Sequence, residues 1–147
     1  MSGLSGAAAG ALQRALSAEH AAVWVYGLAS AYGTEKRVNT AVSDALQEHA
    51  DQRGQAEQAL RRAGEAAPIA QPAYSVPQPV TDQMSAIRAA LTAETDCQVG
   101  WRSVLENAED RQLREIALQG LTTSTTRAAR WRITIDEPGA QAFPGQP

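Results

Sequence analysis

A proline-rich segment at residues 64–80, GEAAPIAQPAYSVPQPV, constrains the fold most strongly, because it separates two helical halves of the chain. Its four prolines exclude a helix and favour extended polyproline geometry, since proline lacks the backbone N–H and fixes φ. Seventeen residues in that geometry span about 53 Å, whereas a helix of about 28 residues is about 42 Å long. The segment is therefore long enough to run the full height of a helical bundle, which a short turn would not need.

Four other stretches carry apolar residues at helical spacing. The expected helices are residues 2–31, 35–63, 81–107 and 109–135. The sequence predicts an all-α four-helix bundle over residues 1–137, followed by an extended Pro/Gly tail at 138–147. Two helical hairpins joined by one long extended crossover, at 64–80, are the connectivity of ferritin-like bundles.

Local signals mark several helix ends. Gly33 and Gly64 follow the first and second helices, where glycine commonly caps a helix in the left-handed conformation. Thr81 or Asp82 is suited to be the N-cap of the third helix, because a short oxygen-bearing side chain accepts a free backbone N–H there.

The composition limits the partners and the compartment. The chain has 147 residues and a formal charge of −3, which argues against nucleic acid, and no apolar run reaches the roughly 18 residues of a membrane span. A single cysteine, Cys97, excludes an intramolecular disulfide and fits a reducing compartment. Residues 1–16 do not have the pattern of a signal peptide. We expect a cytoplasmic protein with no nucleic-acid or membrane partner.

Small side chains dominate the expected core. The chain has only three Trp, three Tyr and one Phe, and its first helix is rich in alanine, which allows close helix contacts. The Ala-rich faces and the lone Phe143, set among prolines and glycines, predict a homodimer. The tail is expected to be either disordered or held by Phe143 against the bundle or another subunit.

Three polar residues interrupt the apolar stripes near the middle of their helices: Glu19 in the first, His49 in the second and Glu94 in the third. In an antiparallel bundle they can meet at one level. Bare ionised groups in a dry core cost several kcal/mol, so these three must be paired, protonated, hydrated or bound to metal.

Two interpretations follow. In the first, Glu19, His49 and Glu94 ligate Fe, Mn or Zn, and the protein is a metal-binding protein or an oxidoreductase. In the second, Arg53 and Arg127 enter the interior and pair with the carboxylates, since guanidinium bridges carboxylates well. We favour the second interpretation and a non-catalytic binding or structural role, because two inward arginines repel a divalent cation.

Further residues near the expected site have secondary roles. Tyr26, two turns after Glu19, either donates a hydrogen bond to it or fills the core, and His20 is a boundary residue expected to bond a carbonyl or a carboxylate. Cys97 follows Glu94 by three residues, so Glu-x-x-Cys is a candidate metal-ligand pair, but a lone thiol on an apolar face more often fills the core. The tryptophans are expected to pack, and a third hypothesis is a small-ligand pocket between the helices. Its lining would be Trp24, Trp101 and Trp131.

The sequence resembles a small ferritin-like domain family of high-GC Gram-positive bacteria, a domain of unknown function, over nearly its whole length. The residues that carry the resemblance are AEHAAVWVYG at Ala18–Gly27, His49 with Arg53, PAYSVPQPV at Pro72–Val80, Glu94, RAARWR at Arg127–Arg132 and FPG at Phe143–Gly145. The resemblance implies a four-helix ferritin-like fold and no particular activity.

The broader ferritin-like superfamily implies iron storage or di-iron oxidation, with a Glu from each of two helices and a Glu-x-x-His from each of the other two. This chain departs from that pattern. Leu46 stands where a Glu would precede His49, and Thr122–Trp131 holds neither Glu nor His. We therefore expect no full di-iron centre.

Overall fold

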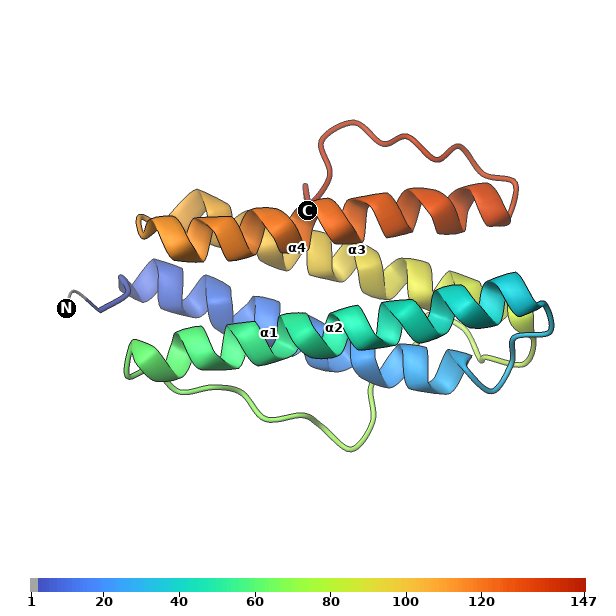
Figure 1. The fold of residues 1–147 in the computed structure, drawn as a ribbon, viewed down its shortest axis with the longest axis horizontal. Helices are drawn as coiled ribbons and strands as arrows, with labels where there is room; N and C mark the ends of the chain where they lie inside the picture. The colour runs from blue at the N-terminus through green and yellow to red at the C-terminus, as the bar shows by residue number, and fades with distance from the viewer. Residues whose placement is uncertain (1–2) are drawn as a thin grey trace.

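The computed structural model describes residues 3–147, and over that range it holds four α-helices and no strand (Figure 1). The helices are α1 (Gly6–Ala29), α2 (Lys36–Arg62), α3 (Gln83–Asn107) and α4 (Arg111–Thr134). The all-α four-helix bundle is confirmed, and only the helix ends differ from expectation. The predicted start at residue 2 lies outside the described residues, and α1 begins after Ser5, whose Oγ accepts the N–H of Ala8 at 3.1 Å.

Of the three helix caps predicted from the sequence, two are present in the structure. Asp82 is the N-cap of α3 and forms a capping box with Ser85. Gly64 has φ +74° after α2, and its N–H donates to Arg61 O at 3.0 Å, as in a Schellman motif. The expectation for Gly33 was wrong. α1 already ends at Ala29, and Gly33 lies in the turn without a left-handed φ.

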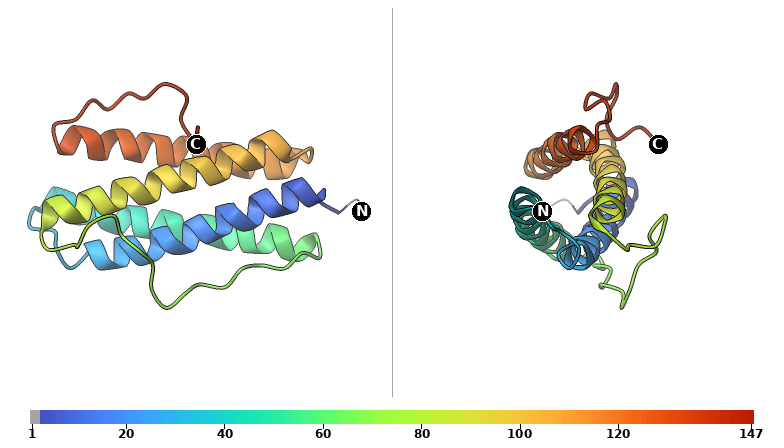
Figure 2. Two further views of the ribbon diagram at one scale, coloured as in Figure 1. Left: turned by 180° about the vertical axis from the view of Figure 1, so that it is seen from behind. Right: turned by 90° about the vertical axis from the view of Figure 1, so that its right-hand side faces the viewer.

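The helices pack unevenly around the bundle. α1 packs against α2 and α3, α3 also packs against α4, and α2 and α4 touch little. Seen along the bundle axis, α2 and α4 flank its more open side (Figure 2). The α1–α3 contact is close because its side chains are small: a Cβ added at Gly100 would lie 2.9 Å from Ala15 Cα. The Ala-rich surface is thus used at least partly within the chain.

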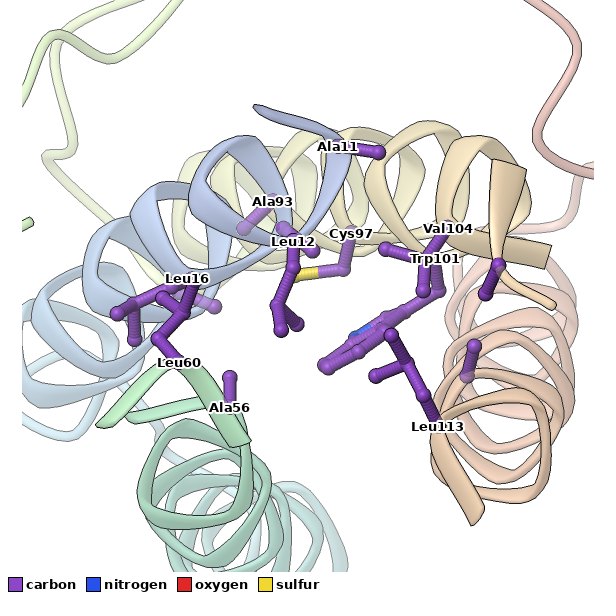
Figure 3. Packing of buried hydrophobic residues seen from close by; sticks show 14 of the residues in the cluster. Ala11, Leu12, Leu16, Ala56, Leu60, Ala93, Cys97, Trp101, Val104 and Leu113 are labelled. Carbon is purple, nitrogen blue, oxygen red and sulfur yellow. The ribbon is translucent and has the colours of Figure 1, made fainter. Parts of the chain in front are cut away.

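The apolar core has two clusters along the bundle. One gathers around Leu12, Leu60 and Trp101, and Figure 3 shows their side chains, together with Cys97, directed into a common interior. The other gathers around Val42 and Ile87. On α2 the change from one cluster to the other falls between Ala45 and Ala56, and His49 of the candidate site described below lies between them.

The crossover between α2 and α3 is long and extended, as predicted, and it follows α1 along the outside of the bundle (Figure 2). Gln13 Nε2 donates to Ala66 O at 2.9 Å, and the rings of Trp24 and Tyr74 lie 6.1 Å apart. Successive turns of α1 therefore hold successive parts of the crossover.

The C-terminal tail folds back on the bundle, but Phe143 does not hold it there. The Phe143 side chain is 70% exposed. The tail is instead held at Gly145, which has φ +79° and packs so closely on Gln98 O that a Cβ would lie 2.5 Å away. Arg102 Nη1 also donates to Pro144 O at 3.3 Å. The expectation of a disordered tail, or one pinned to the bundle by Phe143, was therefore wrong.

Within residues 3–147, none of the helices has the length and apolar character needed to cross a membrane.

Candidate functional site

The structure brings Glu19 of α1, His49 of α2 and Glu94 of α3 into direct contact in the bundle interior. His49 Nδ1 lies 2.6 Å from Glu19 Oε2, and His49 Nε2 lies 2.7 Å from Glu94 Oε1. All three side chains are fully buried. The imidazole therefore bridges two carboxylates that come from different helices.

Arg127 of α4 completes the set of charges. Its Nη1 donates to Glu94 Oε1 at 2.9 Å and lies 3.2 Å from His49 Nε2, while its Nη2 donates to Glu48 Oε2. The Arg127 side chain is only 12% exposed, whereas that of Glu48 is 52% exposed. Arg127 thus extends from the protein interior to the surface and binds one carboxylate at each end of its guanidinium.

Arg53, the other expected interior cation, does not join this set. It is half-buried and forms no ion pair with any residue of the described chain. The inward face of α2 continues from His49 through Gln52 and Ala56, both of which are buried. The rotation of the helix therefore turns Arg53 away from the site.

Three aromatic side chains donate hydrogen bonds to the site. Trp101 Nε1 donates to Glu19 Oε1, Tyr26 OH donates to Glu94 Oε1, and Trp131 Nε1 donates to Tyr26 OH, each at 2.7 Å. Tyr26 therefore donates its hydrogen bond to Glu94, whereas the acceptor expected from the sequence was Glu19. We call Glu19, Tyr26, His49, Glu94, Trp101 and Arg127 the interior network.

From the sequence, Trp101 and Trp131 were expected to be packing residues, and Glu48 was not among the candidate site residues. For Trp101 a partial signal was present, because a buried indole N–H needs an acceptor and the expected interior carboxylates offered one, although the stripe did not show that this acceptor is Glu19. No comparable signal pointed to Glu48, whose partner comes from a distant helix.

The electrostatics of the network follow from its geometry. Burial lowers the pKa of His49, but the charge of Glu94 and the hydrogen bonds to both carboxylates outweigh burial and raise that pKa to about 9. Burial raises the pKa of Glu94, but the charges of His49 and Arg127 bring it below its usual value. His49 is thus an imidazolium with two donors, and two cations balance the two carboxylates.

Two further titratable groups are Tyr26 of the network and Cys97, which adjoins it. Burial, reinforced by Glu94, raises the pKa of Tyr26 well above its ordinary value. Burial, reinforced by Glu19 and Glu94, does the same for the pKa of the Cys97 thiol. Both groups are therefore neutral, and Cys97 is a reduced cysteine within the core.

The residues present do not fit a full di-iron centre. α4 faces the site with the cation Arg127 where such a centre needs a carboxylate and an imidazole. Both nitrogens of His49 already lie against carboxylates. A smaller set remains, since Glu19, His49 and Cys97 each offer one ligand atom, and these atoms lie within 4.8 Å of one another.

His20 and Trp24 lie away from the interior network. His20 Nε2 is 3.0 Å from Pro68 O, so it binds the crossover through a backbone carbonyl. Trp24 packs on Tyr74 of the same segment, whereas Trp131 lies on the far side of the bundle between α2 and α4. The three tryptophans therefore do not line one shared pocket.

A groove of about 560 Å³ lies between α2 and α4, where the two helices touch little. We call it the α2–α4 groove. Its lining residues are Arg37, Val38, Ala41, Asp44, Ala45, Glu48, Thr122, Thr123, Thr126, Arg127, Arg130, Trp131, Ile133 and Thr134. The ion pair between Glu48 and Arg127 forms part of its wall, so the groove adjoins the interior network.

Comparisons with known proteins identify the family but name no activity. The chain is similar to a conserved hypothetical protein, Rv2844, from Mycobacterium tuberculosis, whose crystal structure has 37% sequence identity and a TM-score of 0.83. The match covers 88% of this chain and 98% of that one. No curated protein matches. Residues 11–147 match a family described as "Domain of unknown function (DUF4439)", and the chain belongs to that family.

Proposed function

We propose that this protein is a ferritin-like bundle that serves as a non-catalytic binding protein and lacks a full di-iron centre. Two helical hairpins joined by a crossover of bundle length support the ferritin-like assignment. In this proposal the carboxylates that would ligate metal in a ferritin-like protein have become acceptors in a charge-balanced network, which fixes the four helices around a binding surface.

One observation carries the proposal: His49 places one nitrogen on Glu19 and the other on Glu94, at 2.6 and 2.7 Å. Two such contacts require a donor on each nitrogen, so the imidazole is protonated on both and has no lone pair for a metal ion. Arg127 adds a second positive charge on the same Glu94 oxygen. The interior acids are thus neutralised without an ion.

Metal content tests the proposal directly. We expect elemental analysis of untagged protein, purified without chelator, to find less than about 0.1 equivalent of Fe, Mn or Zn. We also expect the melting temperature to be unchanged by EDTA, because no metal contributes to the free energy of unfolding. Stoichiometric metal in the wild type, lost from Glu94→Gln, would overturn the proposal.

A mononuclear metal site is a second candidate, favoured by the convergence of Glu19, His49 and Cys97 within 4.8 Å. A soft cation bound there would have to displace the protons of the imidazolium and the thiol. Titration with Co²⁺ distinguishes this candidate, because a cobalt–thiolate charge-transfer band would appear in the wild type and disappear in Cys97→Ser. We expect no band.

Two further features of the proposal concern assembly and compartment. A homodimer stays a prediction; the exposed Phe143 supports it, and light scattering tests it. A cytoplasmic location is supported by the single cysteine, which is buried and unpaired.

A further inference from the structure

The α2–α4 groove combines an apolar surface with a polar rim. Val38, Ala45 and Trp131 line the groove and are buried, and Ala41 is partly buried, so the inner wall of the groove is apolar. Threonine side chains of α4 flank them. Its volume of about 560 Å³ falls in the range of small-molecule sites, which are mostly apolar with a few placed polar groups.

Positive charge predominates among the charged groups that line this groove. Arg37, Arg127 and Arg130 face Asp44 and Glu48. Arg37 and Arg130 are exposed, and neither forms an ion pair with a residue of the described chain. The one acidic group that is paired, Glu48, is paired with Arg127. In a chain of net charge −3, this local excess of arginine favours an anionic ligand.

Arg127 is the preorganised anchor of the groove. Its Nη1 is fixed by the buried Glu94, and its Nη2 is held by a side chain, Glu48, that is half exposed. The Glu48 carboxylate therefore occupies a position that a ligand carboxylate could take with the same hydrogen bond. The exchange replaces one carboxylate by another on the same Arg127 nitrogen, and Glu48 can return to water because its side chain is half exposed.

We propose that the α2–α4 groove binds a small organic carboxylate with a flat apolar body, whose carboxylate displaces Glu48 from Arg127 Nη2 while its body lies along Trp131 and Ala41. The inference deepens the proposed binding role and rests on it. In this proposal the interior network positions the binding group, because it keeps Arg127 oriented and charged at the groove.

Calorimetric titration of the full chain with 2-naphthoate tests this inference, with the uncharged 2-naphthamide as the matched probe. We expect 2-naphthoate to bind and the amide to bind at least about tenfold more weakly, because a charge-assisted hydrogen bond is lost. No binding of 2-naphthoate at millimolar concentration, or equal binding of both probes, would overturn the inference. So would tighter binding of 2-naphthyl phosphate, which would make the site a phosphate site.

Variants at residues outside the interior network locate the binding. Glu48→Gln removes the competing carboxylate, so 2-naphthoate should bind about two- to fivefold more tightly. The matched control is Glu115→Gln, which removes an exposed acid paired with Arg111 on α4 outside the groove, and it should leave binding unchanged. Equal affinity in wild type and Glu48→Gln would contradict the displacement of Glu48.

Ala41→Phe fills the groove and should abolish binding while circular dichroism shows an intact helical fold. Unchanged binding in folded Ala41→Phe would place the ligand elsewhere and overturn the inference. The metal analysis described above is independent of these titrations. Metal in the purified protein would contradict the metal-free interior, whereas absence of 2-naphthoate binding would contradict the groove as a carboxylate site.

Discussion

At the scale of single residues, His49 connects the buried charged groups of three helices. Its two nitrogens satisfy one carboxylate on α1 and one on α3, and Arg127 satisfies the second of these again from α4. Burying four ionisable groups is tolerable only because each charge has an opposite charge within hydrogen-bonding distance. Loss of the proton from His49 would leave two buried carboxylates, Glu19 and Glu94, and only one cation, Arg127, to balance them.

The protonation of His49 predicts a pH dependence of stability. Its pKa is raised to about 9 in the folded protein, against about 6.5 in the unfolded chain. A raised pKa contributes stability that is fully present below about pH 6.5 and is lost as the pH rises through about 9. We expect the free energy of unfolding, measured by urea denaturation, to fall by about 3 kcal/mol across that window.

Two variants serve as references for this measurement. His20→Gln changes a histidine that lies outside the interior network, against the crossover carbonyl of Pro68 and 3.9 Å from Glu57 Oε1, so it should keep the alkaline loss of stability. His49→Gln should be less stable than wild type at about pH 6 by about 3 to 5 kcal/mol and should lose most of the slope. A wild-type free energy of unfolding that stays flat from about pH 6.5 to about pH 9 would contradict a protonated His49, whether or not His49→Gln folds.

At the scale of secondary-structure elements, the α1–α3 contact depends on the absence of a side chain. Gly100 lies against the backbone of Ala15, and a Cβ there would meet Ala15 Cα at 2.9 Å. The flexible end of a side chain could move aside, but a helix backbone cannot do so without separating the helices. This close contact positions Glu19 and Glu94 near enough to share His49.

Two glycine-to-alanine substitutions in helix interiors test this. Alanine raises intrinsic helix stability by about 1 kcal/mol in both cases. A Cβ added at Gly54 of α2 would meet nothing within 4 Å, so Gly54→Ala should gain that amount. Gly100→Ala should instead show a net loss of about 1 kcal/mol, because overpacking costs about 1–3 kcal/mol. Urea denaturation measures both, and equal stabilisation by the two substitutions would contradict the close α1–α3 contact.

At the scale of the whole molecule, the interior network closes a bundle whose apolar packing is incomplete. α2 and α4 touch little directly, and the polar contacts of Arg127 with Glu48 and with the His49–Glu94 pair span that side. The remaining space between the two helices is the α2–α4 groove. Polar groups thus connect the helices on the side where α2 and α4 do not pack closely.

Uneven packing predicts uneven hydrogen exchange. α1 and α3 pack against each other, and each packs against one further helix, whereas α2 and α4 each have one close neighbour. We expect the central amides of α1 and α3 to exchange only through global unfolding, and those of α4 to exchange through local opening at lower free energy. Native-state exchange followed by mass spectrometry measures this. Slowest exchange in α2 or α4 would contradict the packing described.

Much of the fold could be predicted because it is encoded locally. The stripes around Leu12, Val42 and Ile87 repeat at helical spacing, and four prolines exclude a helix between residues 64 and 80. Interior positions for Glu19, His49 and Glu94 also followed, because a polar residue in the middle of an apolar stripe is carried inward with its neighbours. Gly33 and Phe143 were misjudged, because a cap and a tail contact depend on where the chain already lies.

The sequence by itself determined the four helices, the long crossover and the burial of two acids and an imidazole, since helix periodicity and proline geometry are properties of the local chain. Only the tertiary structure decided that Arg127 rather than Arg53 reaches Glu94, that Trp101 donates to Glu19, and that Glu48 holds the outer end of Arg127. These partners come from different helices. Their distances depend on how closely α1, α2, α3 and α4 approach and on how each is rotated, and no local pattern specifies either quantity.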